Sequence, residues 1–454
     1  MTPNPTTVSR RDFVRVGMAV GGGLLVTVYG CGPKDAAAPV AGGGLFEPNA
    51  FVQIDGSGNV LVLSKHLEMG QGSYTGLATI IADEMDADWN RVRVEGAPAD
   101  AKKYANTAFG MQGTGGSSAI ANSWEQHRKA GATARAVLMA AAAKQWGVAA
   151  TELTTEPGVV VHAKSKRRAE YGTLVAAAAK LPVPETVTLK NPKDFRYIGK
   201  DKGTPRVDAK PKSTGTATYT QDVKLPGMLT AVVAHPPLFG ATVKSFDATK
   251  AKAVPGVTDV VQIPTGVAVL GEHFWAARQG RAALTVEWDT SAANKLGSAE
   301  VMAQFRDLAG KPGIEIHKEG DAEAAIGKAA KTVEATYEFP YLSHASMEPL
   351  NCVVHLRKDG AEIWNGDQFQ TFDQAAVAGV FGMKPDQVKI NTLYAGGSFG
   401  RRANAKSDYL VEAATIAKAI EGRAPVKMVW TREDDIAEFD SPNDQGNSAA
   451  ANNH

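Results

Sequence analysis

The chain has 454 residues, of which 44% are hydrophobic and 21% are charged, and its formal net charge is +1. These values are typical of a globular chain of about three domains, and they exclude a wholly disordered protein. The near-neutral charge gives no sign of a nucleic-acid partner, and two cysteines, Cys31 and Cys352, are too few for a zinc site or an iron-sulfur cluster held by thiolates.

The amino end has the layout of an export signal. Arg10 and Arg11 precede an apolar run from residue 16 to residue 29, which glycines interrupt. The run is too short for a typical membrane span, and paired arginines are characteristic of the twin-arginine export route, so we expect a periplasmic protein. Two outcomes stay open for the mature amino end: cleavage within residues 36–38, or acylation of Cys31 as a lipid anchor.

After the signal and linker over residues 1–44, we expect an ordered region over residues 45–205. The predicted elements are a hairpin over 51–63, a glycine turn at 69–72, a helix through 77–85, a strand at 92–95, a glycine-rich loop at 112–118 and an alanine-rich helix over 123–146. The order strand, glycine turn, helix, strand indicates a crossover between parallel strands.

The glycine turn at Gly70 and Gly72 is a candidate phosphate cradle. Missing side chains let a ligand approach the backbone, and free N–H groups at a helix start favour an anion. An ordinary tight turn is the first alternative. A dinucleotide-binding turn is the second, and the late third glycine, Gly76, argues against it.

Three further regions follow along the chain. Short strands and turns over residues 206–295 predict a compact α/β module, and residues 296–329 have the charged, helical character of a spacer. Residues 330–436 then contain a predicted strand at 332–339, a helix over 375–381, a strand at 388–390 and a glycine-rich loop at 396–402. The polar tail over residues 437–454 is expected to be disordered.

Four motifs occur in order along the chain: Glu68-Met69-Gly70-Gln71-Gly72, Met347-Glu348-Pro349, the loop at 396–402, and Thr431-Arg432-Glu433-Asp434-Asp435. Together they resemble the molybdopterin-binding subunit of the xanthine dehydrogenase and aldehyde oxidase family, in the branch of the isoquinoline 1-oxidoreductase beta subunits. Residues 206–295 resemble the a/b hammerhead domain of that family. The resemblance implies an α+β fold in which pieces of the molybdopterin-binding domain flank the hammerhead domain.

The resemblance implies a molybdenum-molybdopterin cofactor in its cytosine dinucleotide form, whose metal the pterin holds without a protein ligand. The implied contact residues are Gly70, Gln71, Gly72, Thr114, Ser117, Ser118, Gln368, Gly397, Ser398, Phe399, Gly400 and Arg401. Gln71 would hydrogen-bond the pterin, the serines and Thr114 would contact phosphates, and Phe399 and Gly400 would offer N–H groups beside the molybdenum. Gln368 would lie near an oxygen ligand of the metal or would cap a loop, and both interpretations stay open.

Charged residues beside these motifs have more than one interpretation. Glu348 is either a polar group on the substrate side or the partner of an arginine such as Arg401, and we prefer the ion pair. Arg401 and Arg402 are also consistent with a solvated pair. Ala403 stands where xanthine dehydrogenase has a second active-site glutamate, which argues against purine hydroxylation.

The implied reaction is hydroxylation of an aldehyde or an N-heterocycle with oxygen from water. Electrons would leave through an iron-sulfur small subunit, and a cytochrome c is a further candidate partner. In the family the general base is a glutamate beyond the counterpart of residue 436, so we expect the sequence to be truncated before that base. The alternative function is a non-catalytic remnant or an exported cofactor-binding lipoprotein.

Overall fold

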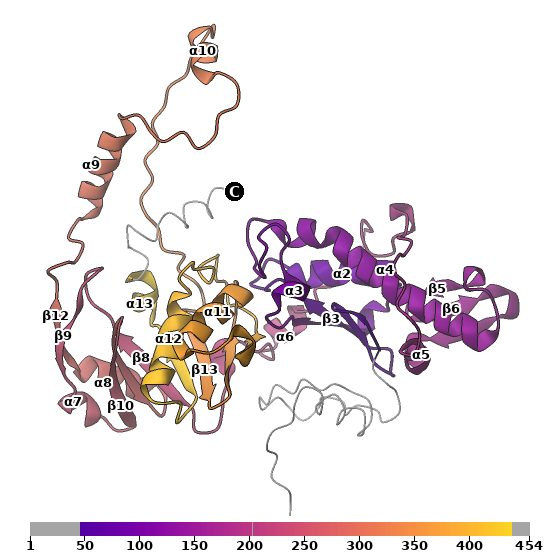
Figure 1. The fold of residues 1–454 in the computed structure, drawn as a ribbon, viewed down its shortest axis with the longest axis horizontal. Helices are drawn as coiled ribbons and strands as arrows, with labels where there is room; N and C mark the ends of the chain where they lie inside the picture. Colours follow the sequence, from indigo (N-terminus) through magenta and orange to yellow (C-terminus); the bar gives the residue numbers. More distant parts are fainter. Residues whose placement is uncertain (1–45, 202, 438–454) are drawn as a thin grey trace, which may run out of the picture.

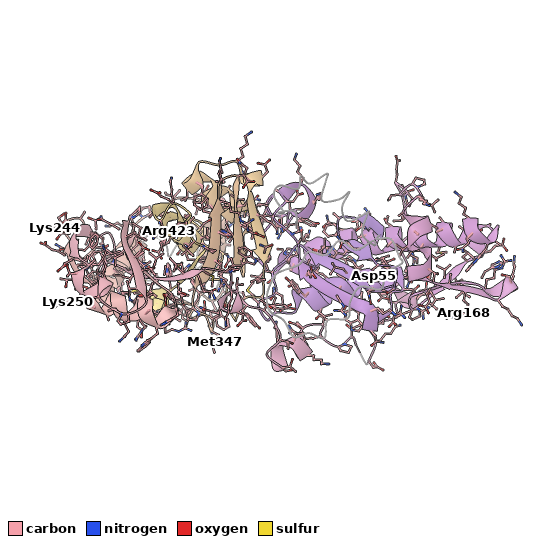
Figure 2. All side chains as sticks on the ribbon, turned by 90° about the horizontal axis from the view of Figure 1, so that it is seen from below. Asp55, Arg168, Lys244, Lys250, Met347 and Arg423 are labelled. Atoms are coloured by element: carbon pink, nitrogen blue, oxygen red, sulfur yellow. The ribbon has the colours of Figure 1, made fainter. Side chains whose placement is uncertain are left out.

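The computed structural model describes residues 46–201 and 203–437, so the predicted export signal, Cys31 and the polar tail lie outside the described residues. The described chain has two halves (Figure 1): an N-terminal half, residues 46–201, and a C-terminal half, residues 203–437. Asp55 and Arg168 lie at one side of the molecule, and Lys244 and Arg423 lie at the other (Figure 2). No helix among the described residues has both the length and the apolar composition needed to span a membrane.

A four-stranded sheet and two helices form the main body of the N-terminal half. The strands β1 (Phe46–Asn49), β2 (Val52–Ile54), β3 (Val60–Ser64) and β4 (Val92–Gly96) are adjacent in that order, and α2 (Ser73–Met85) connects the parallel pair β3 and β4. The predicted hairpin, glycine turn, helix and strand are therefore confirmed. Because this sheet contains one parallel pair only, the dinucleotide-binding alternative is not supported.

The long helix α4 (Ser118–Trp146) packs closely against α2. Gly131 permits the approach, because a Cβ atom at this position would lie 2.5 Å from the carbonyl oxygen of Ile81. The remaining elements of this half are η1 (Trp89–Arg91), α3 (Ala101–Tyr104), η2 (Ala150–Glu152), β5 (Thr154–Glu156), β6 (Val159–His162), η3 (Ala163–Ser165), β7 (Arg167–Glu170), α5 (Tyr171–Ala178) and η4 (Pro192–Asp194). The strands β5, β6 and β7 form a separate small sheet.

The C-terminal half is organised around one mixed seven-stranded sheet with the order β10-β11-β8-β16-β13-β14-β15. Its strands are β8 (Leu229–Ala234), β10 (Val257–Ile263), β11 (Gly266–Gly271), β13 (Asn351–Arg357), β14 (Gly360–Asn365), β15 (Val388–Thr392) and β16 (Val426–Val429). Strands from the predicted 206–295 module and from the 330–436 region share this sheet, because β8 pairs in parallel with β16. The mixture of sheets and helices confirms the α+β fold class.

Helices and a short ribbon complete this half. They are α6 (Ala209–Ser213), η5 (Thr220–Asp222), β9 (Thr242–Asp247), α7 (Thr249–Lys252), α8 (Phe274–Ala283), β12 (Thr285–Asp289), α11 (Gln370–Phe381), η6 (Pro385–Gln387), α12 (Asp408–Ala419) and α13 (Arg432–Ala437). The buried apolar core lies between the sheet and α12, and it includes Leu270, Cys352, Ile363, Leu410 and Met428. The thiol of Cys352 is fully buried in this core.

A charged cluster joins the 206–295 module to the rest of the half. His235 Nε2 lies 2.8 Å from Glu412 Oε1, and Arg281 pairs with Asp434 at 2.7 Å. Trp430 donates its indole N–H to Glu412. Burial alone would raise the pKa of Asp434, but the ring of His235, 3.9 Å away, and the charge of Arg281 lower it to about 2.

This lowered pKa predicts an acid-sensitive contribution to stability, which Asp434→Asn should remove. A carboxylate whose folded-state pKa lies below its ordinary 3.8 stabilises the fold above about pH 4 and loses that contribution as the pH falls toward about 2. The free energy of unfolding, measured in urea, should fall in both chains when the pH is lowered from about 7 to about 2. The fall should be about 2 kcal/mol larger in the unaltered chain than in the variant. Identical pH profiles would show that Asp434 titrates normally.

Residues 296–342 form an arm that projects away from the sheets (Figure 1). The arm contains α9 (Ser298–Ala309) and α10 (Ala322–Gly327), and its returning segment, residues 328–342, contains no strand. The described chain has no strand at residues 332–339, so this prediction is wrong. Its residues have strand-like alternation, but no neighbouring strand of the described chain lies beside them to form the ladder of hydrogen bonds.

Candidate functional site

A pocket of about 600 Å³ opens where the two halves meet, and we call it the seam pocket. It is lined by Met69, Gly70, Gln71, Lys212, Tyr219, Ala395, Gly396, Gly397 and Phe399. The fold thus brings the first glycine turn together with the loop at 396–402, although they are far apart in sequence. Lys212 and Tyr219 were not predicted as site residues, because neither lies in a motif.

The N–H groups of the first glycine turn already have an acceptor within the chain. The fully buried carboxylate of Glu68 accepts hydrogen bonds from the N–H groups of Gly70 (2.8 Å), Gly72 (3.2 Å) and Tyr74 (3.1 Å). Gly70 and Gly72 adopt φ angles of +114° and +92°, which favour glycine. The carboxylate of Glu68 thus occupies the predicted phosphate cradle, and phosphate binding at this turn stays a prediction.

Two cations from the segment after the N-terminal half balance the charge of Glu68. Arg206 Nη2 and Lys212 Nζ lie 3.2 Å and 3.5 Å from Glu68 Oε1. Both cations also pair with Asp208; burial would raise the pKa of this carboxyl, but their hydrogen bonds and charges lower it to about 2. The Lys212 ammonium also lies 4.9 Å from the ring centre of Tyr394. This network fixes the segment against the turn.

Gln71 lies at the exposed rim of the seam pocket. Its Oε1 accepts the N–H of Met69 at 2.8 Å, and its Nε2 donates to the carbonyl of Leu67 at 2.7 Å. The side chain is held in a local loop, so its contact with a pterin stays a prediction.

The second glycine-rich loop lies at the seam between the halves but does not line the seam pocket. Thr114 Oγ1 accepts the N–H of Leu67 at 2.9 Å, and Ser118 Oγ donates to the carbonyl of Gly115 at 2.6 Å. Ser117 is exposed at the start of α4. Phosphate contacts by these three residues stay a prediction, in which Ser117 has the most accessible hydroxyl.

Buried amides at the seam have atoms without a partner in the described chain. These atoms are Gln112 Nε2, Gln368 Oε1 and both polar atoms of the Gln370 side chain. Gln368 Nε2 donates to the carbonyl of Thr114 at 2.7 Å, so this amide caps a loop with one end and leaves the other end unpaired. Unpaired buried amides are rare, and a group that both donates and accepts hydrogen bonds, such as a pterin or a nucleotide, fits them.

The loop at 396–402 exposes backbone donors at the seam pocket. Gly397, Phe399 and Gly400 have φ angles of +68°, +51° and +95°. Within the described chain, the N–H groups of Phe399 and Gly400 have no acceptor. A Cβ atom at Gly396 would lie 2.6 Å from the Cβ atom of Glu348, so the loop cannot accept a larger residue there. Ser398 is fully buried, and its hydroxyl faces the sulfur of Met69 at 3.3 Å.

Both arginines that end this loop are buried, so their interpretation as a solvated pair is wrong. Arg401 pairs with Asp408 at 2.6 Å. Arg402 Nη1 donates to Asn365 Oδ1 at 2.8 Å, and its Nη2 lies 3.6 Å from Glu348 Oε2. The preferred ion pair of Glu348 is therefore present, but it forms with Arg402 rather than with Arg401.

Two buried carboxyl groups, Asp367 and Asp373, lie near Arg402. Burial raises the pKa of Asp367 to about 6, although the charge of Arg402 opposes this shift. Burial and the neighbouring Asp367 raise the pKa of Asp373 as well. No group of three histidine, cysteine, aspartate or glutamate side chains within residues 46–201 and 203–437 is arranged to hold a metal ion.

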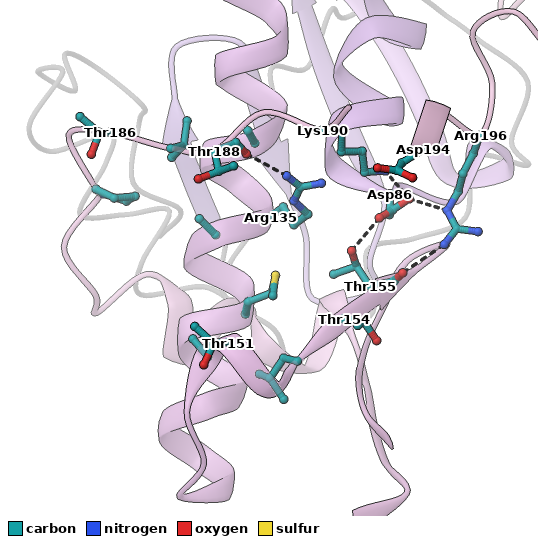
Figure 3. A pocket seen from close by; sticks show the side chains of 17 residues that line it. Asp86, Arg135, Thr151, Thr154, Thr155, Thr186, Thr188, Lys190, Asp194 and Arg196 are labelled. Carbon is teal, nitrogen blue, oxygen red and sulfur yellow. Dashed lines mark hydrogen bonds and ion pairs between the residues drawn. The ribbon is translucent and has the colours of Figure 1, made fainter. Parts of the chain in front are cut away.

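A second pocket, of about 630 Å³, lies within the N-terminal half (Figure 3). Its walls come from α4, the start of β5 and residues 184–196. Asp86 pairs with Lys190 at 2.6 Å and with Arg196, and Arg135 donates to the carbonyl of Thr188 at 3.1 Å. Four of the charged side chains in this pocket, those of Asp86, Arg135, Lys190 and Arg196, are thus engaged with the chain itself, and none of the predicted site residues lines it.

Comparison with known proteins gives two matches to the molybdopterin cofactor-binding domain, over residues 7–233 and 308–444. The chain is 35% identical to the isoquinoline 1-oxidoreductase beta subunit of Brevundimonas diminuta, over 96% of this chain and 60% of that protein. It is 32% identical to the membrane-bound aldehyde dehydrogenase (pyrroloquinoline-quinone) of Gluconacetobacter polyoxogenes, over 92% and 56%. It is 27% identical to a nicotinate dehydrogenase subunit of Pseudomonas putida, over 84% and 32%. The chain thus spans less than two thirds of the length of each of these relatives.

Proposed function

Because this chain belongs to the xanthine dehydrogenase and aldehyde oxidase family of molybdopterin cofactor-binding proteins, we propose that it is the large subunit of a molybdenum hydroxylase. The proposed reaction hydroxylates an aldehyde or an N-heterocycle with oxygen from water. The names of the relatives include both substrate classes. The observation that carries the proposal is the seam, where loops from both halves meet and carry unpaired buried amides and open N–H groups.

We propose that the molybdopterin cofactor, in its cytosine dinucleotide form, binds along this seam. The amides of Gln112, Gln368 and Gln370 would hold its pterin and nucleotide, and the N–H groups of Phe399 and Gly400 would donate to its oxygen atoms. When bound, the cofactor supplies the redox chemistry that inserts oxygen and removes two electrons from the substrate. The chain itself would orient the cofactor and would keep a positive charge, Lys212, at the wall of the seam pocket.

We further propose that the chain is exported by the twin-arginine route, directed by Arg10 and Arg11, and acts in the periplasm. Acylation of Cys31 would attach it to the membrane surface. The proposed electron acceptor is an iron-sulfur small subunit, and a cytochrome c is the proposed next partner. Export of a folded, cofactor-loaded chain agrees with a cofactor that is bound along a seam between two halves.

The experiment that tests this function is purification from the periplasm of a host that makes the cofactor, with the iron-sulfur partner produced beside the chain. We expect one molybdenum per chain, release of CMP on acid hydrolysis, and dye reduction with isoquinoline, nicotinate or an aldehyde. Gln370→Leu should lower molybdenum retention without lowering the free energy of unfolding, because it removes an amide that has no partner in the chain. A chain that never retains molybdenum, with its partner present, would rule the proposal out.

A further inference from the structure

Two carboxyl groups lie against each other in the interior of the C-terminal half. Asp367 follows β14, Asp373 lies in the first turn of α11, and both side chains are buried. A hydrogen bond joins the two side chains. A carboxylate only accepts hydrogen bonds, so two carboxyl groups can bond to each other only when one of them holds a proton.

The remaining contacts of the pair show where this proton lies. Asp367 Oδ1 accepts the N–H of Phe369 at 3.1 Å, and Asp373 Oδ1 accepts the hydroxyl of Ser407. The Oδ2 atom of each carboxyl is buried and has no other partner in the described chain. Because both Oδ2 atoms lie in the interior, a group from another chain cannot reach them. One proton between the two carboxyl groups would satisfy both.

The charged and titratable groups around the pair favour one proton rather than none. Arg402 is the cation that faces the pair, and it supports one negative charge there. Asp408 adds a negative charge beside Asp373 and opposes a second one. The Cys352 thiol and the Tyr409 hydroxyl also face the pair, and both are neutral because burial raises their pKa. Two ionised carboxylates in contact at this buried position would be strongly unfavourable.

The pair closes the short segment that carries two of the unpaired seam amides, Gln368 and Gln370. Asp367 precedes this segment, and Asp373 follows it by three residues. Gln368 Nε2 donates to the carbonyl of Thr114 at 2.7 Å, and the N–H of Thr114 donates to the carbonyl of Gln368 at 3.0 Å. The segment thus docks on the second glycine-rich loop of the other half. A change in the distance between the two carboxyl groups would move both amides relative to that loop.

We propose that Asp367 and Asp373 share one buried proton at neutral pH, and that this pair positions the amides of Gln368 and Gln370 for the cofactor. Asp373 holds the proton and donates it to the carboxylate of Asp367. Loss of the proton would place two like charges in contact, and the segment between them would open. The positioning role rests on the cofactor binding proposed above, whereas the shared proton is a property of the chain alone.

Infrared difference spectroscopy tests the shared proton in the full chain without its cofactor. Asp373→Asn replaces the protonated carboxyl by an amide, whose N–H can donate to Asp367 while its oxygen accepts from Ser407. At about pH 7 the unaltered chain should show the carbonyl stretch of a protonated carboxyl that the variant lacks. Asp386→Asn, which removes an exposed carboxyl, should keep this band. Equal bands in all three chains would mean that water bridges two carboxylates, and they would overturn the proposal.

Hydrogen exchange tests whether the proton holds the segment in place. Burial raises the pKa of both carboxyl groups, that of Asp367 to about 6, so the pair stabilises the fold at low pH and loses this contribution as the pH rises through the folded-state values. Once the pH is high enough to remove the infrared band, the backbone amides of residues 367–371 should exchange severalfold faster in the unaltered chain than in Asp373→Asn. The amides of α4 should exchange alike in both chains. Equal exchange of residues 367–371 would overturn the positioning role.

Molybdenum retention tests the link between the pair and the cofactor. With the iron-sulfur partner present, the unaltered chain should lose molybdenum when the pH is raised past the loss of the infrared band, and Asp373→Asn should retain it. Equal loss from both chains would overturn the positioning role. Absence of molybdenum from every chain at neutral pH would instead refute the proposed function and the positioning role with it, and the infrared band would still decide whether the proton is shared.

Discussion

Replacing Glu68 by alanine is expected to lower the free energy of unfolding by about 3–5 kcal/mol, because a buried ion pair that loses one partner leaves an uncompensated charge. The carboxylate is fully buried, and both Arg206 and Lys212 point at it. The same change removes the acceptor of the N–H groups of Gly70 and Gly72. Urea unfolding followed by tryptophan fluorescence measures the loss.

Two comparison variants make the result specific. Glu170→Ala removes a surface carboxylate that is 60% exposed and pairs with Arg91 at 3.3 Å, and it should cost no more than about 1 kcal/mol. Glu68→Gln keeps an oxygen acceptor for the turn but removes the charge, so its cost should fall between the two. If Glu68→Ala costs no more than Glu170→Ala, the carboxylate does not hold the turn together.

Glu68 also connects the stability of the first glycine turn to the structure of the seam pocket. Its carbonyl oxygen accepts the N–H of Ala395 at 3.2 Å, so one residue contacts the first glycine turn through its side chain and the start of the later loop through its backbone. Both loops line the seam pocket. Glu68→Ala should therefore make the loops of the seam pocket more mobile under conditions in which both halves stay folded. The measurement is hydrogen exchange, and the backbone amides of residues 69–72 should exchange faster in the variant.

Local sequence was sufficient to predict the elements around the seam. Gly70 and Gly72 sit between a strand pattern and a helix pattern, and only a turn connects such elements in so few residues. The charge partners of the turn could not be predicted in this way. Arg206 and Lys212 are distant in sequence, and their approach to Glu68 depends on how the segment after residue 203 returns across the seam.

Burial of polar residues was the main feature that local pattern failed to predict. Adjacent arginines such as Arg401 and Arg402 are usually solvated, and only the packing of the loop under Glu348 and Asn365 buries the second one. Gln112 and Gln370 have no spacing that marks them as ligand-binding residues. The alternation at 332–339 was recognised correctly, but a pattern within one strand contains no information about which strand pairs with it.

Arg402→Met is expected to destabilise the C-terminal half by about 3–5 kcal/mol at neutral pH, because it leaves the carboxyl groups of Glu348 and Asp367 without the cation beside them. The arginine side chain has no exposed surface, and it contacts Asn365 and lies 3.6 Å from Glu348. Its positive charge also opposes the rise that burial causes in the pKa of Asp367, which stands at about 6. Without that charge the pKa of Asp367 should rise further.

The direction of this shift makes the prediction dependent on pH. A carboxyl whose folded-state pKa is raised contributes stability below its ordinary value of 3.8, and that contribution is lost as the pH rises through the folded-state value of about 6. Arg402→Met should therefore cost more free energy at about pH 7 than at about pH 5, where Asp367 of the variant stays protonated. Arg168→Met, which removes an arginine that is 53% exposed and pairs with Glu156 at 2.6 Å, is the control, and its small cost should be the same at both values. An equal loss for Arg402→Met at both pH values would mean that the arginine packs in the core without controlling the charge of the carboxyl beside it.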